Sequence, residues 1–335
     1  MKAIKPLFFI TIIISLCGCQ KATSNVEQSS ISSGPTSISS SQKEKKVPEY
    51  LTSLPIPSDL KKPNDKKGMV ETFEYQTKIY DINGNASSNI NKKAEIYLPY
   101  DYDEKNSYNV LYLMHGGGED ETYWLTKEKD TVNVLDNIFA QNIAQPCIVV
   151  APTFYTGTSS SGSIQSEITD LFQYEFRNDL VPAFEKEYAT YCKGDVSLNN
   201  LIETRGHRGF AGLSMGSMVS IRSILIGCLD ICGYISSMSG GYDSNDNNGL
   251  TGYAKVEEAV LETFADYPVL YWLNQNGTDD IALTPHLNLK DRVLEGLDDV
   301  FAEDENFKWI LFQGGQHNYD AWLVHLYNTL QIFFD

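Results

Sequence analysis

The sequence predicts an α/β fold in which helices cover both faces of a mostly parallel central sheet. Short, continuous apolar runs alternate along the chain with segments of helical period, and this alternation is typical of strand–helix units that build a parallel sheet. Strands that are covered on both faces carry such continuous apolar runs. The 335 residues, 42% of them hydrophobic, are enough for one large domain or two small domains with a sizeable core.

Two strands with alternating apolar residues open the regular part of the chain, over residues 70–80 and 93–98. The alternation indicates half-buried strands, which we expect to form an antiparallel pair at one edge of the sheet. The continuous apolar runs predict six further strands, over residues 109–114, 147–151, 209–213, 234–238, 269–273 and 309–312. Between the strands, the helical period predicts helices over residues 132–141, 168–187, 217–226, 256–264, 287–301 and 319–334.

Residues 1–18 are predicted to be a lipoprotein signal peptide. A basic start precedes an apolar run over residues 7–16, which is too short to span a membrane and is typical of a secretory signal. The segment Leu16-Cys17-Gly18-Cys19 resembles a bacterial lipobox, and the resemblance implies that Cys19 becomes the lipidated first residue. A plain signal peptide with an incidental cysteine is the alternative. We therefore expect an exported protein that is lipid-anchored at the outer face of the cell membrane.

Residues 19–67 are predicted to be a flexible, serine-rich tether to a folded domain over residues 68–335. Nine of the 27 residues at 20–46 are serine and none is aromatic, so this stretch buries too little apolar surface to offset the entropy cost of order. Four cysteines remain beyond Cys19, and an exported location permits disulfides without selecting one of the three full pairings. Cys147 opens an apolar run and is expected to be a buried thiol.

The formal net charge of −18 argues against two classes of partner. Nucleic-acid binding requires cationic side chains that neutralise phosphates, and a peripheral grip on anionic lipids requires a polybasic surface. We therefore expect no nucleic-acid partner, and contact with a membrane only through the N-terminal lipid anchor. The cysteines and histidines lack the spacing of a structural zinc site, so no metal is expected.

The strand over residues 209–213 leads into Gly212-Leu213-Ser214-Met215-Gly216, and a helical pattern follows. This G-x-S-x-G pattern is typical of a tight turn that exposes a nucleophilic serine hydroxyl, because the small residues let strand and helix approach closely. An ordinary strand–helix turn is the alternative. Ligands of parallel sheets bind beyond the carboxyl ends of the strands, so Ser214 is the candidate nucleophile.

A second strand, over residues 109–114, ends at His115-Gly116-Gly117-Gly118. A glycine-rich turn at this place can aim backbone N–H groups at a developing oxyanion, and the N–H of Met215 would be the partner donor. A phosphate-binding loop is the alternative, but the lysine of a P-loop and the spacing of a dinucleotide-binding loop are missing. We expect His115 to be a structural residue at the strand end rather than a base.

The partners of a serine nucleophile in such a fold follow it in the order acid, then histidine. Of His286, His317 and His325, only His317 lies in a loop directly after a predicted strand, where an imidazole can reach the serine. The acid is expected after the preceding strand, at Asp280, with its neighbour Asp279 as the alternative. Adjacent carboxylates point in different directions, so the aspartate that does not hold the imidazole is expected to cap the following turn.

Five sequence blocks that include these motifs occur in the order HGGGEDETYW, FRNDLVPAFEKEY, RGHRGFAGLSMGS, NGTDDIA and GGQHNYDAW. Together they resemble the esterase-D-type α/β-hydrolases over about residues 70–335, and most of all the feruloyl and acetyl-xylan esterases of carbohydrate esterase family one. The resemblance implies an α/β-hydrolase catalytic domain over residues 68–335, with Ser214 as nucleophile and His317 as base. It also implies that Asp280 is the acid and that Gly117 is the first oxyanion donor.

The resemblance further implies a feruloyl esterase-like serine hydrolase that acts on acyl esters of plant cell-wall polysaccharide or oligosaccharide, without a metal or organic cofactor. Trp124, Tyr155 and Trp322 are then candidate contacts for a feruloyl ring or a sugar, although core or rim packing is the alternative for each ring. An acetyl-xylan esterase, an acyltransferase or another ester hydrolase could use the same residues. A surface binding protein with an idle hydrolase fold is the alternative from a different class.

Overall fold

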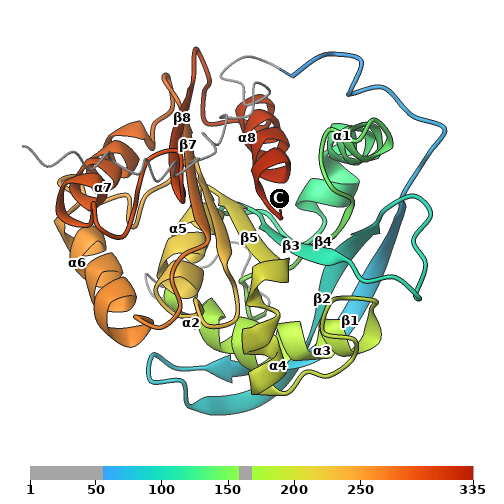
Figure 1. Ribbon diagram of the computed structural model, residues 1–335, viewed down its shortest axis with the longest axis horizontal. Coiled ribbons are helices and arrows are strands. Elements are labelled where there is room, and N and C mark those ends of the chain that lie inside the picture. Colours follow the sequence, from blue (N-terminus) through green and yellow to red (C-terminus); the bar gives the residue numbers. More distant parts are fainter. Residues whose placement is uncertain (1–55, 158–167, 335) are drawn as a thin grey trace, which may run out of the picture. The chain divides into compact units, whose positions relative to one another are not determined.

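The computed structural model describes residues 56–157 and 168–334, and the statements below about structure refer to these residues. Eight strands form one sheet in the order β1-β2-β4-β3-β5-β6-β7-β8 (Figure 1). The predicted signal peptide, Cys19 and the serine-rich stretch lie outside the described residues. The strands are β1 (Met69–Tyr80), β2 (Ala86–Leu98), β3 (Asn109–Met114), β4 (Cys147–Ala151), β5 (Arg208–Leu213), β6 (Tyr234–Met238), β7 (Tyr271–Gly277) and β8 (Phe307–Phe312).

The sheet is antiparallel at one edge and parallel elsewhere, which confirms the α/β fold that the sequence predicts. β1 pairs with β2, and β2 with β4, in antiparallel register. All further neighbours, from β4 through β3 and β5 to β8, are parallel. The carboxyl ends of β3, β5, β7 and β8 therefore lie along the same edge of the sheet, and this edge collects the polar residues that follow these strands.

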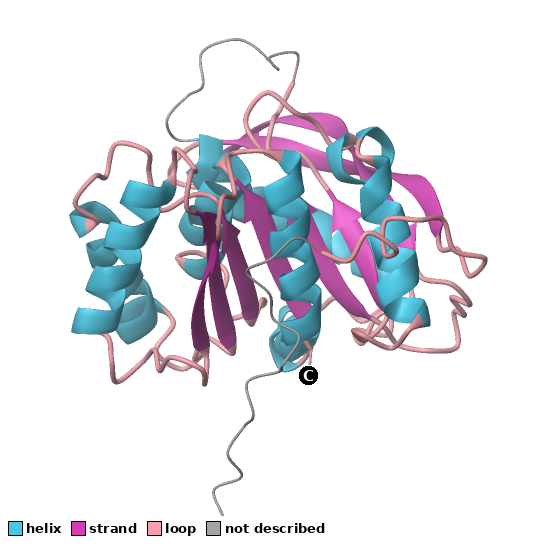
Figure 2. Ribbon diagram, turned by 90° about the horizontal axis from the view of Figure 1, so that it is seen from above, coloured by secondary structure: helices cyan, strands magenta, loops and turns pink. Residues whose placement is uncertain are grey.

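Helices lie on both faces of the sheet (Figure 2). The side chains of one strand accordingly point alternately to two buried clusters. In β3, Tyr112 belongs to the first cluster, and its neighbours Leu111 and Leu113 belong to the second. The second cluster is covered by α1 (Lys129–Ala140) and α8 (Tyr319–Ile332). The first is covered by α2 (Ile168–Glu175), α3 (Val181–Glu187), α4 (Leu198–Glu203), α5 (Met215–Val219), α6 (Leu250–Glu258) and α7 (Leu283–Gly296).

Several helices differ in their bounds from the sequence prediction. The helix predicted over residues 168–187 occupies that span, but a wider π-helical turn, Phe176–Leu180, joins α2 to α3. α6 and α7 each begin before the helices predicted over residues 256–264 and 287–301, and α4 has no counterpart in the prediction. The early start of α6 shortens the connection from β6, which is the loop that borders the site described below.

β7 (Tyr271–Gly277) lies further along the chain than the strand predicted over residues 269–273. Its second half is polar and nevertheless buried, because its side chains hydrogen-bond inside the protein. Gln275 Nε2 donates to a backbone oxygen of α8 over 2.9 Å, and Asn276 Oδ1 lies 3.0 Å from Nδ1 of the buried His286. Polar residues that satisfy one another leave no apolar run in the sequence, and the prediction therefore ended the strand too early.

The described part of the predicted tether packs onto the domain, so the predicted boundary at residue 67 is wrong. Ile56 and Leu60 are buried in the same cluster as the apolar face of α1. Asn137 Nδ2, in α1, donates to the backbone oxygens of Leu60 and Lys62 over 3.0 and 2.7 Å. Buried apolar side chains and bound carbonyl groups hold this segment on the helix, and the folded domain thus includes residues 56–67.

Each of the four cysteines beyond the N-terminal segment is a buried, free thiol, so none of the three possible pairings forms in the structure: Cys147, Cys192, Cys228 and Cys232. The prediction of a buried thiol at Cys147 is confirmed. Within residues 56–157 and 168–334, we find no helix with the length and apolar character needed to cross a membrane. The same residues contain no group of three histidine, cysteine, aspartate or glutamate side chains that could hold a metal ion.

Candidate active site

The turn between β5 and α5 holds Ser214 in a backbone conformation that non-glycine residues rarely adopt, with φ at +52° and ψ at −116°. The N–H of Ser214 donates to the backbone oxygen of Met238 over 2.9 Å, which ties the turn to the neighbouring strand β6. A Cβ on Gly212 would lie 2.1 Å from the backbone oxygen of Gly216, and a Cβ on Gly216 would lie 2.4 Å from that of His115. Both positions therefore require glycine, and their backbones fix the direction of the serine hydroxyl.

His317 lies in the loop after β8 and contacts the serine directly. Its Nε2 is 2.9 Å from Ser214 Oγ, and its Nδ1 is 2.8 Å from Asp280 Oδ1. The next residue, Asn318, caps the start of α8, because its side chain accepts a hydrogen bond from the N–H of Ala321. The helix that begins here holds the backbone next to His317 in place. The structure thus brings together the three side chains that the sequence predicted to form the catalytic group.

Asp280 closes the turn after β7, and its side chain is completely buried. Burial pushes the pKa of this carboxyl upward, but hydrogen bonds from His317 and from the N–H of Ala282 outweigh burial and hold the pKa below its ordinary value. Asp279 is exposed and accepts a hydrogen bond from Thr278 Oγ1, so geometry selects Asp280 as the partner of the histidine. The expectation that Asp279 caps the turn is wrong, because Asp280 makes that bond itself.

The glycine-rich turn after β3 packs against the serine turn. A Cβ on Gly116 would lie 2.6 Å from Leu213 Cδ1, and a Cβ on Gly117 would lie 2.7 Å from Met215 Sδ. Among the described residues, neither the N–H of Gly117 nor that of Met215 has a hydrogen-bond acceptor. Two unpaired N–H groups on adjoining turns are what an oxyanion site requires, and these are the two donors predicted from the sequence.

His115 holds the glycine-rich turn in place and takes no part in the histidine–serine contact. Its Nδ1 donates to the backbone oxygen of Gly116 over 2.7 Å, and its Nε2 accepts from Thr153 Oγ1 over 2.8 Å, an assignment that follows from the carbonyl acceptor. Burial lowers the pKa of His115 to about 4, so the ring is neutral near pH 7. Tyr155 Oη accepts from the N–H of Gly118 and fixes the other end of the turn. Sequence reasoning missed Thr153, a lone threonine after a strand, because no motif marks it.

The three predicted aromatic contacts have different surroundings. Trp124 is fully buried and its Nε1 donates to the backbone oxygen of Met114, so the expectation that it touches substrate is wrong. Its apolar ring fills the core below the glycine-rich turn instead. Trp322 is half-buried and meets the ring of His317 edge-on, with 5.1 Å between ring centroids. Tyr155 contacts the turn as described above, and contact of either ring with substrate stays a prediction.

A cavity of about 550 Å³, here called the catalytic cavity, opens at Ser214 and His317. One part of its wall is apolar and contains Ile281, which is 84% exposed although it directly follows the buried Asp280. Sequence reasoning missed this wall, because isolated apolar residues in loops form no periodic pattern. The other lining residues are Met215, Met218, Ser239, Gly240, Gly241, Ser244, Asn247, Ala282, Thr284 and Pro285.

A serine hydroxyl paired with a buried acid–histidine unit, beside two unpaired N–H groups, can attack a carbonyl and hold the resulting oxyanion. The sequence pattern of the Esterase family matches residues 86–331, a span that contains all of these residues. The chain belongs to the Esterase family. The resemblance to esterases in the sequence blocks is thereby confirmed at the level of the family.

Two curated relatives of this esterase are xylan-degrading enzymes by name. Endo-1,4-beta-xylanase Y of Acetivibrio thermocellus is 29% identical over 247 residues, which cover 72% of this chain and 22% of that protein. An endo-1,4-beta-xylanase/feruloyl esterase of Xylanibacter ruminicola is 33% identical over 153 residues, which cover 44% of this chain and 19% of that protein. The chain thus spans about a fifth of the length of the curated relatives it matches.

A solved structure of a single esterase module matches most of this chain. The feruloyl esterase module of Clostridium thermocellum, a serine-to-alanine mutant complexed with sinapinate, superposes with a TM-score of 0.67 at 26% identity. The match covers 84% of this chain and 93% of that module. The eight-stranded sheet and its helices therefore form the fold of a single esterase module, and the predicted fold class is confirmed.

Proposed function

We propose that this chain is a feruloyl esterase-like serine hydrolase that releases acyl groups from plant cell-wall polysaccharide or oligosaccharide. The observation that carries the proposal is the chain of contacts from Ser214 through His317 to the buried Asp280, with 2.9 and 2.8 Å between the paired atoms. The names of the relatives support the substrate class, since one is a feruloyl esterase module in complex with sinapinate. The apolar wall of the catalytic cavity suits an aromatic acyl group.

The geometry supports a two-step acyl transfer. Ser214 Oγ attacks the ester carbonyl while His317 Nε2 accepts its proton, and the oxyanion of the tetrahedral intermediate accepts hydrogen bonds from the N–H groups of Gly117 and Met215. His317 then returns the proton to the leaving sugar alkoxide, which leaves an acyl-serine. Water attacks this ester in the same manner and releases the acid. One oxyanion donor of this kind contributes about 3 kcal/mol to the stability of the transition state.

Hydrolysis of methyl ferulate by the full-length chain tests this function. We expect release of ferulate by the wild type and its loss in Ser214→Ala and His317→Ala, with labelling by a fluorophosphonate probe only where Ser214 is present. Acetylated xylan and tributyrin, assayed in parallel, identify the alternatives. Cleavage of acetylated xylan without cleavage of methyl ferulate would assign an acetyl-xylan esterase, and absence of both cleavage and labelling would contradict an enzyme of this class.

We also propose that the chain is an exported, lipid-anchored protein. The support for this proposal comes from the sequence, in which an apolar run precedes the lipobox-like segment ending at Cys19. An acylated cysteine would place the esterase outside the cell, where polysaccharide is found. Metabolic labelling with an alkynyl fatty acid should mark the wild type and not Cys19→Ala. Equal labelling of the two proteins would contradict the anchor.

A further inference from the structure

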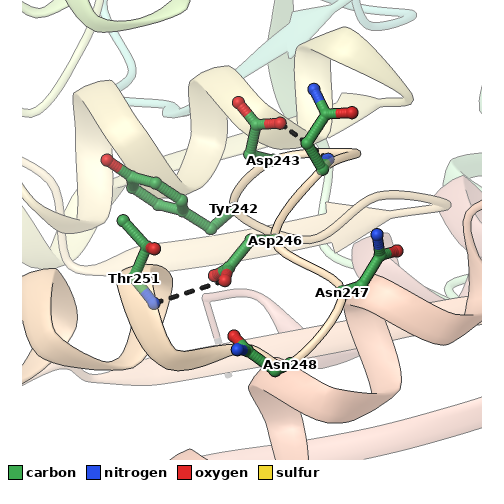
Figure 3. Close-up of a pocket in the computed structure, with 7 residues that line it drawn as sticks. Tyr242, Asp243, Asp246, Asn247, Asn248 and Thr251 are labelled. Atoms are coloured by element: carbon green, nitrogen blue, oxygen red, sulfur yellow. Dashed lines mark hydrogen bonds between the residues drawn. The ribbon is translucent and has the colours of Figure 1, made fainter.

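A second cavity is formed by the loop that joins β6 to α6 and by the first turn of α6, and Figure 3 shows residues that line it. Its volume is about 540 Å³, and we call it the loop pocket. We propose that the loop pocket binds the uncharged sugar units next to the sugar that carries the ester, an inference that rests on the proposed function. The lining residues are Tyr242, Asp243, Asn245, Asp246, Asn247, Asn248 and Thr251.

One loop separates the two cavities. Asn247 lines both of them, and Ser244 lines the catalytic cavity although Asp243 and Asn245, its neighbours in the chain, line the loop pocket. The loop pocket therefore adjoins the cavity that contains Ser214. This proximity is what a site for the remainder of a bound polysaccharide requires.

The carboxylates of the loop pocket are already occupied by hydrogen-bond donors. Asp243 accepts from the guanidinium of Arg222 over 3.1 Å and from the N–H of Asn245 over 2.8 Å. Asp246 is buried and accepts from the N–H groups of Thr251 and Gly252 over 3.3 and 2.8 Å, and Figure 3 shows the first of these bonds. No lysine or arginine lines the pocket, so it offers no cationic group to a phosphate or carboxylate ligand.

The groups that remain available in the loop pocket are neutral. The side-chain amides of Asn245 and Asn247 are exposed, and within the described part of the chain neither has a hydrogen-bond partner. Thr251, which carries a hydroxyl, is likewise an exposed residue. Amides and hydroxyls both donate and accept hydrogen bonds, as sugar hydroxyls do, and the ring of Tyr242 adds apolar area. This combination of groups fits a neutral sugar better than an anion.

The backbone of the loop is held in place from two sides, so binding would cost little conformational entropy. From α7, the side chains of Asn288 and Arg292 donate to the backbone oxygens of Asn247 and Asn248. On the other side, the guanidinium of Arg222 lies over the ring of Tyr242, 4.9 Å from its centroid. These contacts hold the backbone of the loop, whereas the side chains of the exposed Asn245 and Asn247 make no hydrogen bond among the described residues.

The two cavities match the two halves of an acylated polysaccharide. The catalytic cavity presents apolar side chains such as Met218 and Ile281 to the acyl group, whereas the loop pocket presents amides and hydroxyls to the sugar. The pocket should therefore contribute to binding of sugar esters and not of simple alkyl esters. Loss of two neutral hydrogen bonds corresponds to about a tenfold loss of kcat/KM on the sugar ester.

The first test compares two substrates with the same acyl group, methyl ferulate and a feruloylated arabinoxylo-oligosaccharide. In the double variant Asn245→Ala/Thr251→Ala, the ratio of kcat/KM on the oligosaccharide ester to kcat/KM on methyl ferulate should fall about tenfold. Asn89→Ala, an exposed asparagine of β2, is the matched control and should keep the wild-type ratio. Equal ratios in the wild type and the double variant, with unchanged unfolding temperatures, would overturn the proposal.

The second test measures binding without catalysis and so separates this inference from the proposed function. An arabinoxylo-oligosaccharide that lacks the acyl group is titrated into Ser214→Ala by calorimetry, with and without the Asn245→Ala/Thr251→Ala pair. We expect binding in the single variant and at least tenfold weaker binding in the triple variant. Equal binding, or none, in both proteins would overturn the proposal that the loop pocket binds sugar, even if methyl ferulate is cleaved. Failure of the wild type to cleave any feruloyl ester would instead overturn the proposed function.

Discussion

The carboxylate of Asp280, which is completely buried, lies 2.8 Å from Nδ1 of His317. A carboxylate can only accept, so the imidazole carries its proton on Nδ1 and presents a lone pair at Nε2 to Ser214 Oγ. The N–H of Ala282 donates to the same carboxylate oxygen and fixes its direction. The orientation of the proposed base therefore depends on one buried side chain.

Replacement of this carboxylate by an amide tests its role. Asp280→Asn keeps the shape of the side chain but offers His317 a hydrogen-bond donor, which favours the tautomer that cannot accept the serine proton. We expect kcat to fall about 10³- to 10⁴-fold without loss of the fold. Asp279→Asn, one residue away and exposed, is the control and should stay within about twofold of the wild type. Similar losses in both variants would contradict the assignment of the acid.

The pH dependence of hydrolysis follows from the same pair. A protonated imidazole has no lone pair at Nε2 and cannot accept the serine proton, so kcat/KM should decrease as the solution becomes acidic. The hydrogen bonds to Asp280 hold the pKa of its carboxyl below the ordinary value, so near neutral pH the aspartate is ionised and can orient the imidazole. Initial rates on methyl ferulate between pH 4 and pH 9 measure this decrease. A rate that is constant over that range would exclude histidine as the base.

The close approach of the two turns at Ser214 predicts that a methyl group added at Gly216 lowers both stability and activity. A Cβ on Gly216 would lie 2.4 Å from the backbone oxygen of His115, and both atoms belong to packed backbone that must move. Gly216→Ala should lower the free energy of unfolding by about 1–3 kcal/mol and should also reduce activity, because the oxyanion turn moves with His115. Gly157→Ala is the control, since a Cβ there has no neighbour within 4 Å. Chemical denaturation of both variants provides the measurement.

The burial of His325 predicts that the folded protein becomes less stable in acid. The ring is buried in α8, and neither of its nitrogens has a partner among the described residues. Burial lowers its pKa to about 3, whereas an unfolded chain binds this proton near pH 6.5. Stability is therefore lost as the pH falls below about 6.5, by about 1.4 kcal/mol per pH unit. In His325→Leu, the decrease in unfolding free energy between pH 7 and pH 5 should be about 2 kcal/mol smaller than in the wild type. Equal decreases would contradict the neutral, buried state.

The sequence predicted the elements whose signal is local. The apolar runs over residues 109–114, 147–151 and 234–238 coincide with strands β3, β4 and β6, because strands buried on both faces show their burial directly in composition. The turns at Ser214 and Gly117 were predictable for a related reason, since a close approach of backbones requires glycine. These features explain why the central strands and the serine turn could be placed in advance.

Features that depend on distant partners could not be predicted. The second half of β7 is buried through hydrogen bonds to α8 and His286, and residues 56–67 pack on α1, which lies far along the chain. Trp124 stands in a motif block but points into the core. The loop that forms the loop pocket, between β6 and α6, is held by hydrogen bonds from side chains of α7 to its backbone. In each case the decisive partner is remote in sequence, so neither periodicity nor motif spacing reports it.

Asp280 and Ile281 are consecutive residues with opposite surroundings, one sealed in the interior and the other 84% exposed at the cavity mouth. Adjacent codons therefore encode the acid that the proposed mechanism requires and an exposed residue of the cavity wall. Point mutation at residue 281 can therefore reshape the entrance to the cavity while the proton path behind it stays intact. Substitution of Ile281 is therefore expected to change which acyl groups the cavity accepts.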